Sequence, residues 1–134
     1  MKLIESTKKD IEVEQITLLR SSVGWNKVRS EEKWKEILNK SSFIYSVWDE
    51  NKLVGMGRLL EDGIMCNVYD VVVHKDYQGI GIGKMIMNNL MNWTNDKNYT
   101  CIGLFVQPEN KKFLIPFYEK FGFKLVDTGM IIYR

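Results

Sequence analysis

The sequence predicts a mixed α/β fold, in which a mixed sheet of six to seven strands is flanked by about four helices. Strand-like and helix-like hydrophobic patterns alternate along the chain. A helix pattern over 81–95 separates strand patterns over 65–73 and 100–106, which makes those two strands parallel through a right-handed crossover. The run Val71–Val73 is apolar on both strand faces, as in a central strand that is covered on both sides.

The N-terminal half predicts two helices and an antiparallel hairpin. Ser30 followed by Glu31 and Glu32 favours a helix start, because carboxylates stabilise the first turn of a helix. Asp10 is a candidate N-cap for an earlier helix. The predicted elements of this half are a strand over 3–6, a helix over 10–22, a helix from Ser30 onward, and hairpin strands over 43–48 and 52–60.

The C-terminal part predicts one helix and two antiparallel strands. Three phenylalanines recur there at helical spacing, and Gly122 after them suits a left-handed helix end. Pro116 falls inside this pattern, and a proline removes a helix hydrogen bond. We therefore expect a loop over 108–115 and a helix that begins near Pro116. Strands over 123–126 and 130–133 complete the predicted sheet.

Length and composition favour a single domain over 1–134 that resides in the cytoplasm. Hydrophobic residues make up 45% of the chain and charged residues 27%, as in folded globular proteins. No apolar run approaches the roughly 20 residues that span a bilayer. The N-terminus lacks the apolar region of a secretory signal. We expect no membrane partner.

Charge and residue types argue against two further classes of partner. The formal net charge is +2 and the chain has no dense basic block, so we expect no nucleic-acid partner. Cys66 and Cys101 lie in apolar, strand-like runs and are interpreted as buried free thiols. Two cysteines and one histidine are too few for a zinc site, and we expect no metal.

The most informative segment joins the central strand to the next helix, where Gly79, Gly81 and Gly83 alternate. Glycine lets the backbone come close to a bulky ligand. The first turn of a helix leaves unpaired N–H groups and a partial positive charge, which together suit a phosphate or pyrophosphate. Lys84 can add a charged donor. The alternative is a flexible turn that only opens a helix.

Two common phosphate-binding motifs do not fit this segment. A P-loop needs Gly at position 78 and Ser or Thr at 85, where the chain has Gln78 and Met85. The dinucleotide fingerprint G-x-G-x-x-G fails in both possible registers. What remains is Q-x-x-G-x-G, formed by Gln78, Gly81 and Gly83.

This turn resembles that of the GCN5-related N-acetyltransferase (GNAT) superfamily, in which Arg/Gln-x-x-Gly-x-Gly/Ala after the fourth strand binds the pyrophosphate of acetyl-CoA. The resemblance implies that the backbone of Val71–Val73 holds the pantetheine arm like an added strand. It also implies that the Val73 N–H polarises the thioester carbonyl. The implied cofactor contacts are Val71, Val72, Val73, Gln78, Gly79, Ile80, Gly81, Ile82, Gly83 and Lys84.

A second segment, FYEKFGF over 117–123, resembles the F-Y-x-K-x-G-F segment of the same superfamily. In that family the tyrosine often protonates the departing CoA thiolate, which implies a catalytic acid at Tyr118. The alternative is a helical tyrosine packed in the core. Asn110 lies eight residues before Tyr118, whereas many members carry a CoA-contacting asparagine seven residues before it. Asn110 is nevertheless taken as a further cofactor contact.

The motifs do not identify the base that deprotonates the amine. Asp70, just before the valine run, is the candidate catalytic carboxylate, and Glu61 at the end of the preceding strand is another. The alternative for each is a solvated or hydrogen-bonded carboxylate.

Trp25 lies between the first two predicted helices, and its side chain could stack on the acceptor or fill a space in the core. Related sugar-phosphate acetyltransferases carry Glu-Asp where this chain has Tyr69-Asp70, which weakens a sugar-phosphate assignment.

The resemblance implies direct acetyl transfer from acetyl-CoA to a primary amine of a small molecule, within a ternary complex. Two alternatives remain open: a non-catalytic CoA-binding sensor, and an acetyltransferase that acts on a protein N-terminus or lysine. The family often dimerises, so a homodimer is an open expectation.

Overall fold

The computed structural model describes residues 2–134, which form two compact units. The first unit ends at Leu104, and the second runs over Phe105–Arg134. The first contains a sheet with three helices, and the second contains one helix with its flanking segments. The single domain expected over 1–134 stays a prediction.

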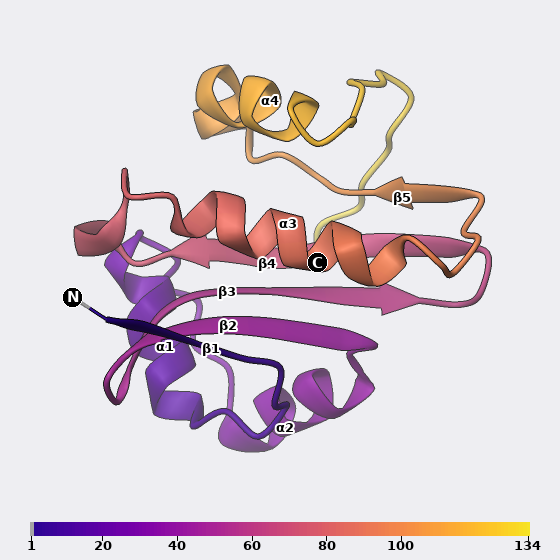
Figure 1. The fold of residues 1–134 in the computed structure, drawn as a ribbon. Helices are drawn as coiled ribbons and strands as arrows, with labels where there is room; N and C mark the ends of the chain where they lie inside the picture. Colours follow the sequence, from indigo (N-terminus) through magenta and orange to yellow (C-terminus); the bar gives the residue numbers. More distant parts are fainter. Residues whose placement is uncertain (1) are drawn as a thin grey trace. The chain divides into compact units, whose positions relative to one another are not determined.

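A five-stranded mixed sheet forms the centre of the first unit (Figure 1). Its strands are β1 (Leu3–Ser6), β2 (Phe43–Asp49), β3 (Lys52–Glu61), β4 (Met65–Val73) and β5 (Cys101–Gly103). Neighbours are antiparallel from β1 to β4, whereas β5 pairs with β4 in parallel. The predicted hairpin and the parallel central pair are confirmed. β5 is shorter than the strand predicted over 100–106, because only its three residues find partners on β4.

Helices cover both faces of this sheet (Figure 1). α1 (Val13–Ser22) and α2 (Glu31–Lys40) lie on one face, and α3 (Ile82–Thr94) lies on the other. The side chains between the first two helices and the sheet form one apolar cluster. Its buried members are Ile11, Ile16, Leu19, Trp34, Leu38, Ile44, Leu53, Met56 and Val72.

The two helix starts predicted in this half have different outcomes. α2 begins directly after Ser30 as predicted, and the Ser30 Oγ caps it by accepting a hydrogen bond of 3.1 Å from the Lys33 N–H. The prediction that Asp10 caps α1 is wrong, because the helix begins at Val13 with Glu12 in the cap position. Ile11 is buried in the core, which holds the chain in a non-helical path up to Glu12.

Two glycines in β3 let α3 pack directly onto the sheet. A Cβ at Gly55 would lie 2.7 Å from Cγ2 of Ile82, and a Cβ at Gly57 would lie 2.7 Å from Cγ2 of Ile86. Side chains at these positions would therefore push the helix away from the strand. The helix stripe of Ile82, Ile86 and Leu90 is at most 1% exposed. This contact fixes where the N-terminus of α3 lies relative to the sheet.

The second unit contains α4 (Lys111–Glu119), preceded by a 3₁₀ turn, η2 (Pro108–Asn110). The prediction of a helix that begins near Pro116 is wrong, because Pro116 lies inside α4. A proline removes one helical hydrogen bond, and the remaining turns are supported by aromatic packing. The rings of Phe113 and Phe117 stack with centroids 6.2 Å apart.

The end of α4 is formed as predicted around Gly122, which has a φ of +94°. The Gly122 N–H bonds to the Glu119 carbonyl at 3.0 Å, and the Phe123 N–H bonds to the Tyr118 carbonyl at 3.4 Å. These two bonds form a Schellman motif, in which a left-handed residue turns the chain so that its N–H and the next N–H bond to the last carbonyls of the helix.

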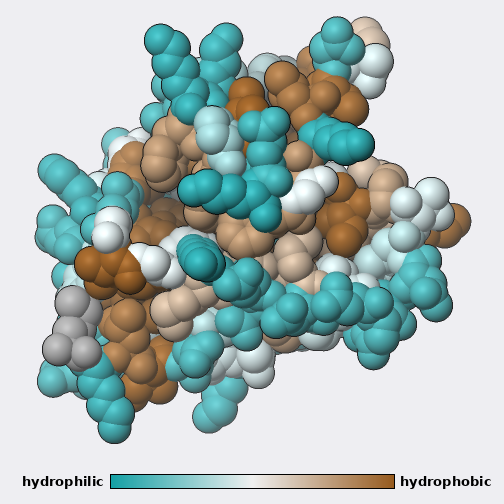
Figure 2. Space-filling view, turned by 45° about the horizontal axis from the view of Figure 1, so that its top comes forward, coloured by the Kyte–Doolittle hydropathy of each residue, from teal (hydrophilic) through white to brown (hydrophobic). Residues whose placement is uncertain are grey.

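The strands predicted over 123–126 and 130–133 are not formed. Within the described chain these segments pair with no strand, and apolar side chains such as Met130 and Ile132 are exposed. Figure 2 shows hydrophobic residues, in brown, among hydrophilic ones on the molecular surface. An alternating pattern decides which side chains share a face, but a strand forms only where another backbone supplies hydrogen bonds. The sheet therefore has five strands rather than six to seven.

Candidate functional site

The chain turns sharply between the end of β4 and the start of α3. A 3₁₀ turn, η1 (Lys75–Tyr77), comes first, and His74 Nδ1 accepts a hydrogen bond of 3.1 Å from the Asp76 N–H. Gly79 and Gly81 follow with φ values of +82° and +94°. Residues with a Cβ rarely adopt this left-handed conformation, so the path of the turn depends on glycine. The turn is exposed to solvent from Gln78 to Gly81.

The N-terminus of α3 presents backbone donors that the helix itself does not use. The first helical hydrogen bond runs from the Met85 N–H to the Gly81 carbonyl at 3.0 Å, so the three N–H groups over 82–84 have no helical acceptor. Gly81 is the cap residue and offers no side-chain acceptor, and the described first turn carries no acidic side chain. Lys84 is exposed in that turn. This arrangement suits an oxyanion such as phosphate.

The edge of β4 that faces away from β3 is unpaired beside this turn. Among residues 2–134, β5 pairs with β4 only over Met65–Asn67 and ends before Val71. The His74 N–H bonds to the Val54 carbonyl of β3 at 2.8 Å. By strand alternation, the N–H groups of Val71 and Val73 point away from β3, toward the unpaired edge. An extended ligand can pair with such an edge.

Val72 and Gln78 serve the protein's own structure. Val72 is paired with Met56 of β3, and by the same alternation its backbone groups face β3 rather than the unpaired edge. The Gln78 amide donates a hydrogen bond of 3.1 Å to the Val73 carbonyl. This bond ties the glycine turn to the end of the strand, so the two parts of the predicted cofactor site are held together.

A β-bulge redirects Asp70. The register of β4 against β3 shifts between Met56 and Arg58, which places one extra residue in β4. Asp70 has a φ of +53°, a conformation that costs a non-glycine residue about 1–3 kcal/mol. Its carboxylate accepts hydrogen bonds from Arg20 Nη1 at 2.6 Å and from Arg58 Nε at 2.7 Å. Each oxygen therefore accepts one arginine hydrogen bond and keeps a further lone pair.

The sequence patterns did not predict the arginine partners of Asp70. Arg20 is 9% exposed, and burial lowers its pKa although the nearby Asp70 charge acts in the opposite direction. Its guanidinium lies 4.9 Å from the ring centre of Trp25 and 5.4 Å from that of Trp34. Trp25 packs against the apolar cluster as well. The position of Arg20 in the sequence could have indicated its burial. It lies four residues after the buried Ile16 and therefore on the core-facing side of α1.

Tyr118 and Asn110, from the second unit, differ in environment. Tyr118 is 9% exposed, and its ring packs edge-on against Phe117 and Phe123 with centroids 5.1 Å and 6.0 Å away. Burial raises the pKa of Tyr118 to about 12, so the phenol is protonated at neutral pH. Asn110 is exposed at the start of α4, where its side chain forms no capping hydrogen bond.

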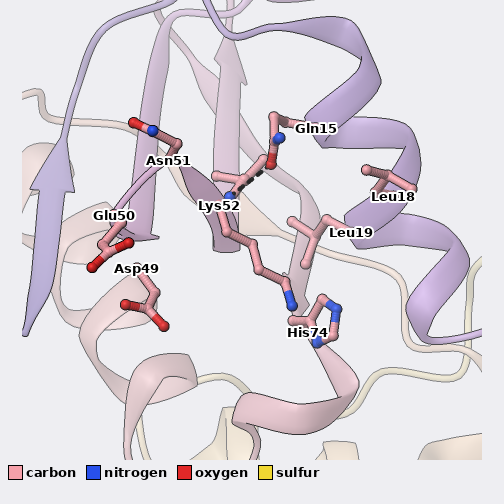
Figure 3. A pocket seen from close by; sticks show the side chains of 9 residues that line it. Gln15, Leu18, Leu19, Asp49, Glu50, Asn51, Lys52 and His74 are labelled. Atoms are coloured by element: carbon pink, nitrogen blue, oxygen red, sulfur yellow. Dashed lines mark hydrogen bonds between the residues drawn. The ribbon is translucent and has the colours of Figure 1, made fainter. Parts of the chain in front are cut away.

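A hollow of about 630 Å³ lies beside the turn between β2 and β3, next to α1 (Figure 3). Figure 3 shows the Lys52 side chain extending toward His74. The side-chain Oε1 of Gln15 accepts a hydrogen bond of 3.0 Å from the Leu53 N–H. Burial and the Lys52 charge lower the pKa of His74, which makes a cationic imidazole less favourable. The hollow lies on the β3 side of the end of β4, whereas the unpaired edge faces the other way.

Glu61 lies at the opposite end of β4 from the glycine turn. It pairs with Cys66 near the start of β4. About seven strand residues, or on the order of 23 Å, separate Cys66 from Val73. Glu61 Oε2 accepts a hydrogen bond of 2.5 Å from the Gly63 N–H. These positions favour a local structural role for Glu61.

The two cysteines differ in exposure. Both cysteines are free, and Cys66 is buried as predicted, but the prediction is wrong for Cys101, which is exposed at the start of the short β5. Over residues 2–134, no group of three or more His, Cys, Asp or Glu side chains is arranged as metal ligands would be. In the same part of the chain, the helices are too short or too polar to cross a membrane.

Comparisons with known proteins agree on one family. The profile of the acetyltransferase (GNAT) family matches residues 11–123. The uncharacterized N-acetyltransferase ycf52 of Porphyra purpurea is 37% identical over 123 residues, which cover 88% of this chain and 68% of that protein. A probable acetyltransferase of unknown function from meticillin-resistant Staphylococcus aureus has a TM-score of 0.85 and 25% identity, covering 99% of this chain and 100% of that chain. A GNAT-family acetyltransferase from Streptococcus pneumoniae has a TM-score of 0.79 and 28% identity, covering 99% of this chain and 98% of that chain.

Proposed function

The chain belongs to the GNAT family of acetyltransferases, and on this premise we propose that it transfers an acetyl group from acetyl-CoA to the primary amine of a small molecule. Members of this family generally use acetyl-CoA as the acyl donor. The nature of the acceptor, the direct attack in a ternary complex and the roles of individual residues belong to the proposal.

One observation carries the proposal: the unpaired edge of β4 leads directly into the exposed glycine turn. Coenzyme A has a peptide-like pantetheine arm that is joined to a pyrophosphate. The β4 edge suits the arm, and the glycine turn that follows it suits the pyrophosphate. The backbone of Val71 and Val73 would pair with the arm. The N–H groups over 79–84 would hold the pyrophosphate, and Lys84 would add a charge.

The proposed chemistry breaks the thioester C–S bond and forms a C–N bond. The amine attacks the acetyl carbonyl, and the Val73 N–H stabilises the negative charge that develops on the carbonyl oxygen. The amine nitrogen loses a proton and the CoA sulfur gains one. We assign that second proton to Tyr118, whose buried phenol stays protonated at neutral pH.

Acetyl transfer is tested with purified protein, acetyl-CoA and a panel of small primary amines, with the released thiol followed by a disulfide reagent. We expect release that depends on the amine. Tyr118→Phe should lower kcat by about 10²- to 10⁴-fold while coenzyme A affinity is unchanged. Thiol release by this variant at the wild-type rate would show that Tyr118 is not the acid. Tight coenzyme A binding without turnover on any amine would instead favour a sensor.

The catalytic role assigned to Asp70 is tested with Asp70→Asn. If Asp70 accepts the amine proton, the variant should lose the acidic limb of the pH profile of kcat/KM. If it only positions Arg20 and Arg58, the rate should fall by a similar factor at every pH. The small-molecule acceptor, the cytoplasmic location and a homodimer stay predictions.

A further inference from the structure

A group of cationic and aromatic side chains is joined to Asp70 through Arg20 and Arg58, and the proposed chemistry does not use this group. We call it the arginine–tryptophan cluster. Its members are Arg20, Arg29, Arg58, Trp25 and Trp34. They come from α1, from the segment between α1 and α2, from α2 and from β3. The tertiary fold therefore assembles the cluster from distant parts of the sequence.

The cluster carries more positive than negative charge. Asp70 is the one carboxylate that forms an ion pair with any of its arginines in the described part of the chain. It bonds to Arg20 and Arg58, but not to Arg29. The charges of Arg29 and Arg58 both disfavour the protonated form of Arg20, so the three guanidinium groups are close enough to repel one another. A second anion would relieve this repulsion.

Arg29 has a buried donor without an acceptor. Its Nη1 atom is shielded from solvent and has no hydrogen-bond partner among residues 2–134. Its guanidinium lies 5.4 Å from the ring centre of Trp34, which orients it but satisfies no N–H with an oxygen. A buried donor left unpaired is unfavourable, and a carboxylate or phosphate oxygen would satisfy it with a charge-assisted bond.

The cluster is connected to the proposed acetyl-transfer site through Asp70. Asp70 is held by Arg20 and Arg58 and lies three residues before Val73, whose N–H is assigned above to the thioester carbonyl. An amine that attacks this carbonyl can extend its remaining atoms along β4 toward the cluster. Resting on the proposed function, we infer that the acceptor is an amine that also carries an acidic group, a carboxylate or a phosphate, and that Arg29 binds this group.

Transfer to matched acceptors tests this substrate class. The pairs are 5-aminopentanoate with pentylamine, and phosphoethanolamine with ethanolamine. We expect the kcat/KM of the wild type to be about 10-fold or more higher for the acidic member of at least one pair. The pair that shows this preference identifies the acidic group of the acceptor as a carboxylate or a phosphate. Arg29→Gln should remove most of that preference. Lys27→Gln removes the same charge from an exposed side chain nearby, and should retain the preference.

A binding measurement separates failure of this inference from failure of acetyl transfer. Pentanoate and ethyl phosphate, which lack the amine, are titrated against intrinsic tryptophan fluorescence, because Trp25 and Trp34 lie within the cluster. Arg29→Gln should weaken the response about 10-fold or more, with an unchanged urea midpoint and coenzyme A affinity as folding controls.

Three results are decisive. Equal transfer to both members of each pair, with no fluorescence response, overturns the acidic acceptor but leaves acetyl transfer intact. A response that is the same in wild type and Arg29→Gln overturns the role of Arg29. If no amine is acetylated, the proposed transfer fails, and the fluorescence titration alone decides whether the anion site exists.

Discussion

Replacing Gly81 by alanine should weaken the binding of coenzyme A by about 5- to 30-fold. Gly81 has a φ of +94°, and a Cβ built there would have no atom within 4 Å. The perturbation is therefore a backbone effect without a clash. A left-handed conformation costs a residue with a Cβ about 1–2 kcal/mol. Because the turn is exposed and little packing holds it, we expect the backbone to relax and the N–H groups to move out of position.

The assay is isothermal titration of coenzyme A into each variant, with urea unfolding as a check on stability. Gly63→Ala is a matched control, since Gly63 has the same φ of +94° and equally open surroundings, but lies in the turn that precedes β4. It should lose stability and keep wild-type affinity. Gly81→Asn should recover part of the affinity, because asparagine tolerates the left-handed region better than alanine does.

A folded Gly81→Ala protein that binds coenzyme A as tightly as the wild type would refute the assignment of the glycine turn to the pyrophosphate. A loss of affinity in Gly63→Ala that equals the loss in Gly81→Ala would refute it too, because a general loss of stability would then account for both.

Three further predictions concern packing and titration. Gly57→Ala should lower the free energy of unfolding by about 1–3 kcal/mol, because the new methyl group would meet Ile86; an unchanged urea midpoint would contradict the close contact of α3 with β3. Burial raises the pKa of Tyr118 from its ordinary value of 10.0 to about 12, so its contribution to stability is complete below pH 10 and is lost as the pH rises toward 12. Over that range the free energy of unfolding should fall less in Tyr118→Phe than in the wild type, by up to about 2 kcal/mol, and parallel curves would contradict this. Near pH 8, iodoacetamide should modify the exposed Cys101 and spare Cys66, whose pKa burial raises to about 11; mass spectrometry that shows equal labelling would count against this burial.

Some features of the fold and site could be predicted from short stretches of sequence. The helix start at Ser30 was predicted because the carboxylates that favour it, Glu31 and Glu32, directly follow it. The glycine turn was also predicted locally, because its three alternating glycines lie within five residues; the positive φ of Gly79 and Gly81 was not predicted. The helix pattern over 81–95 between two strand patterns was enough to predict the parallel pairing of β4 and β5.

Other features depend on partners that are distant in the chain. Asp70 and Arg20 are 50 residues apart, and only the folded sheet with its bulge brings the carboxylate to the guanidinium. The predicted strands over 123–126 and 130–133 had the right alternation but found no backbone to pair with in the described chain. The unpaired edge of β4 likewise exists because β5 ends early.

The sequence by itself determined the glycine turn, the helix start at Ser30 and the order of the elements from β1 to α4, because the interactions responsible act within a few residues. Only the tertiary structure decided which carboxylate meets which arginine, which strand edge stays open and where the sheet ends. Those outcomes depend on burial and on hydrogen-bond partners that come from elsewhere in the chain.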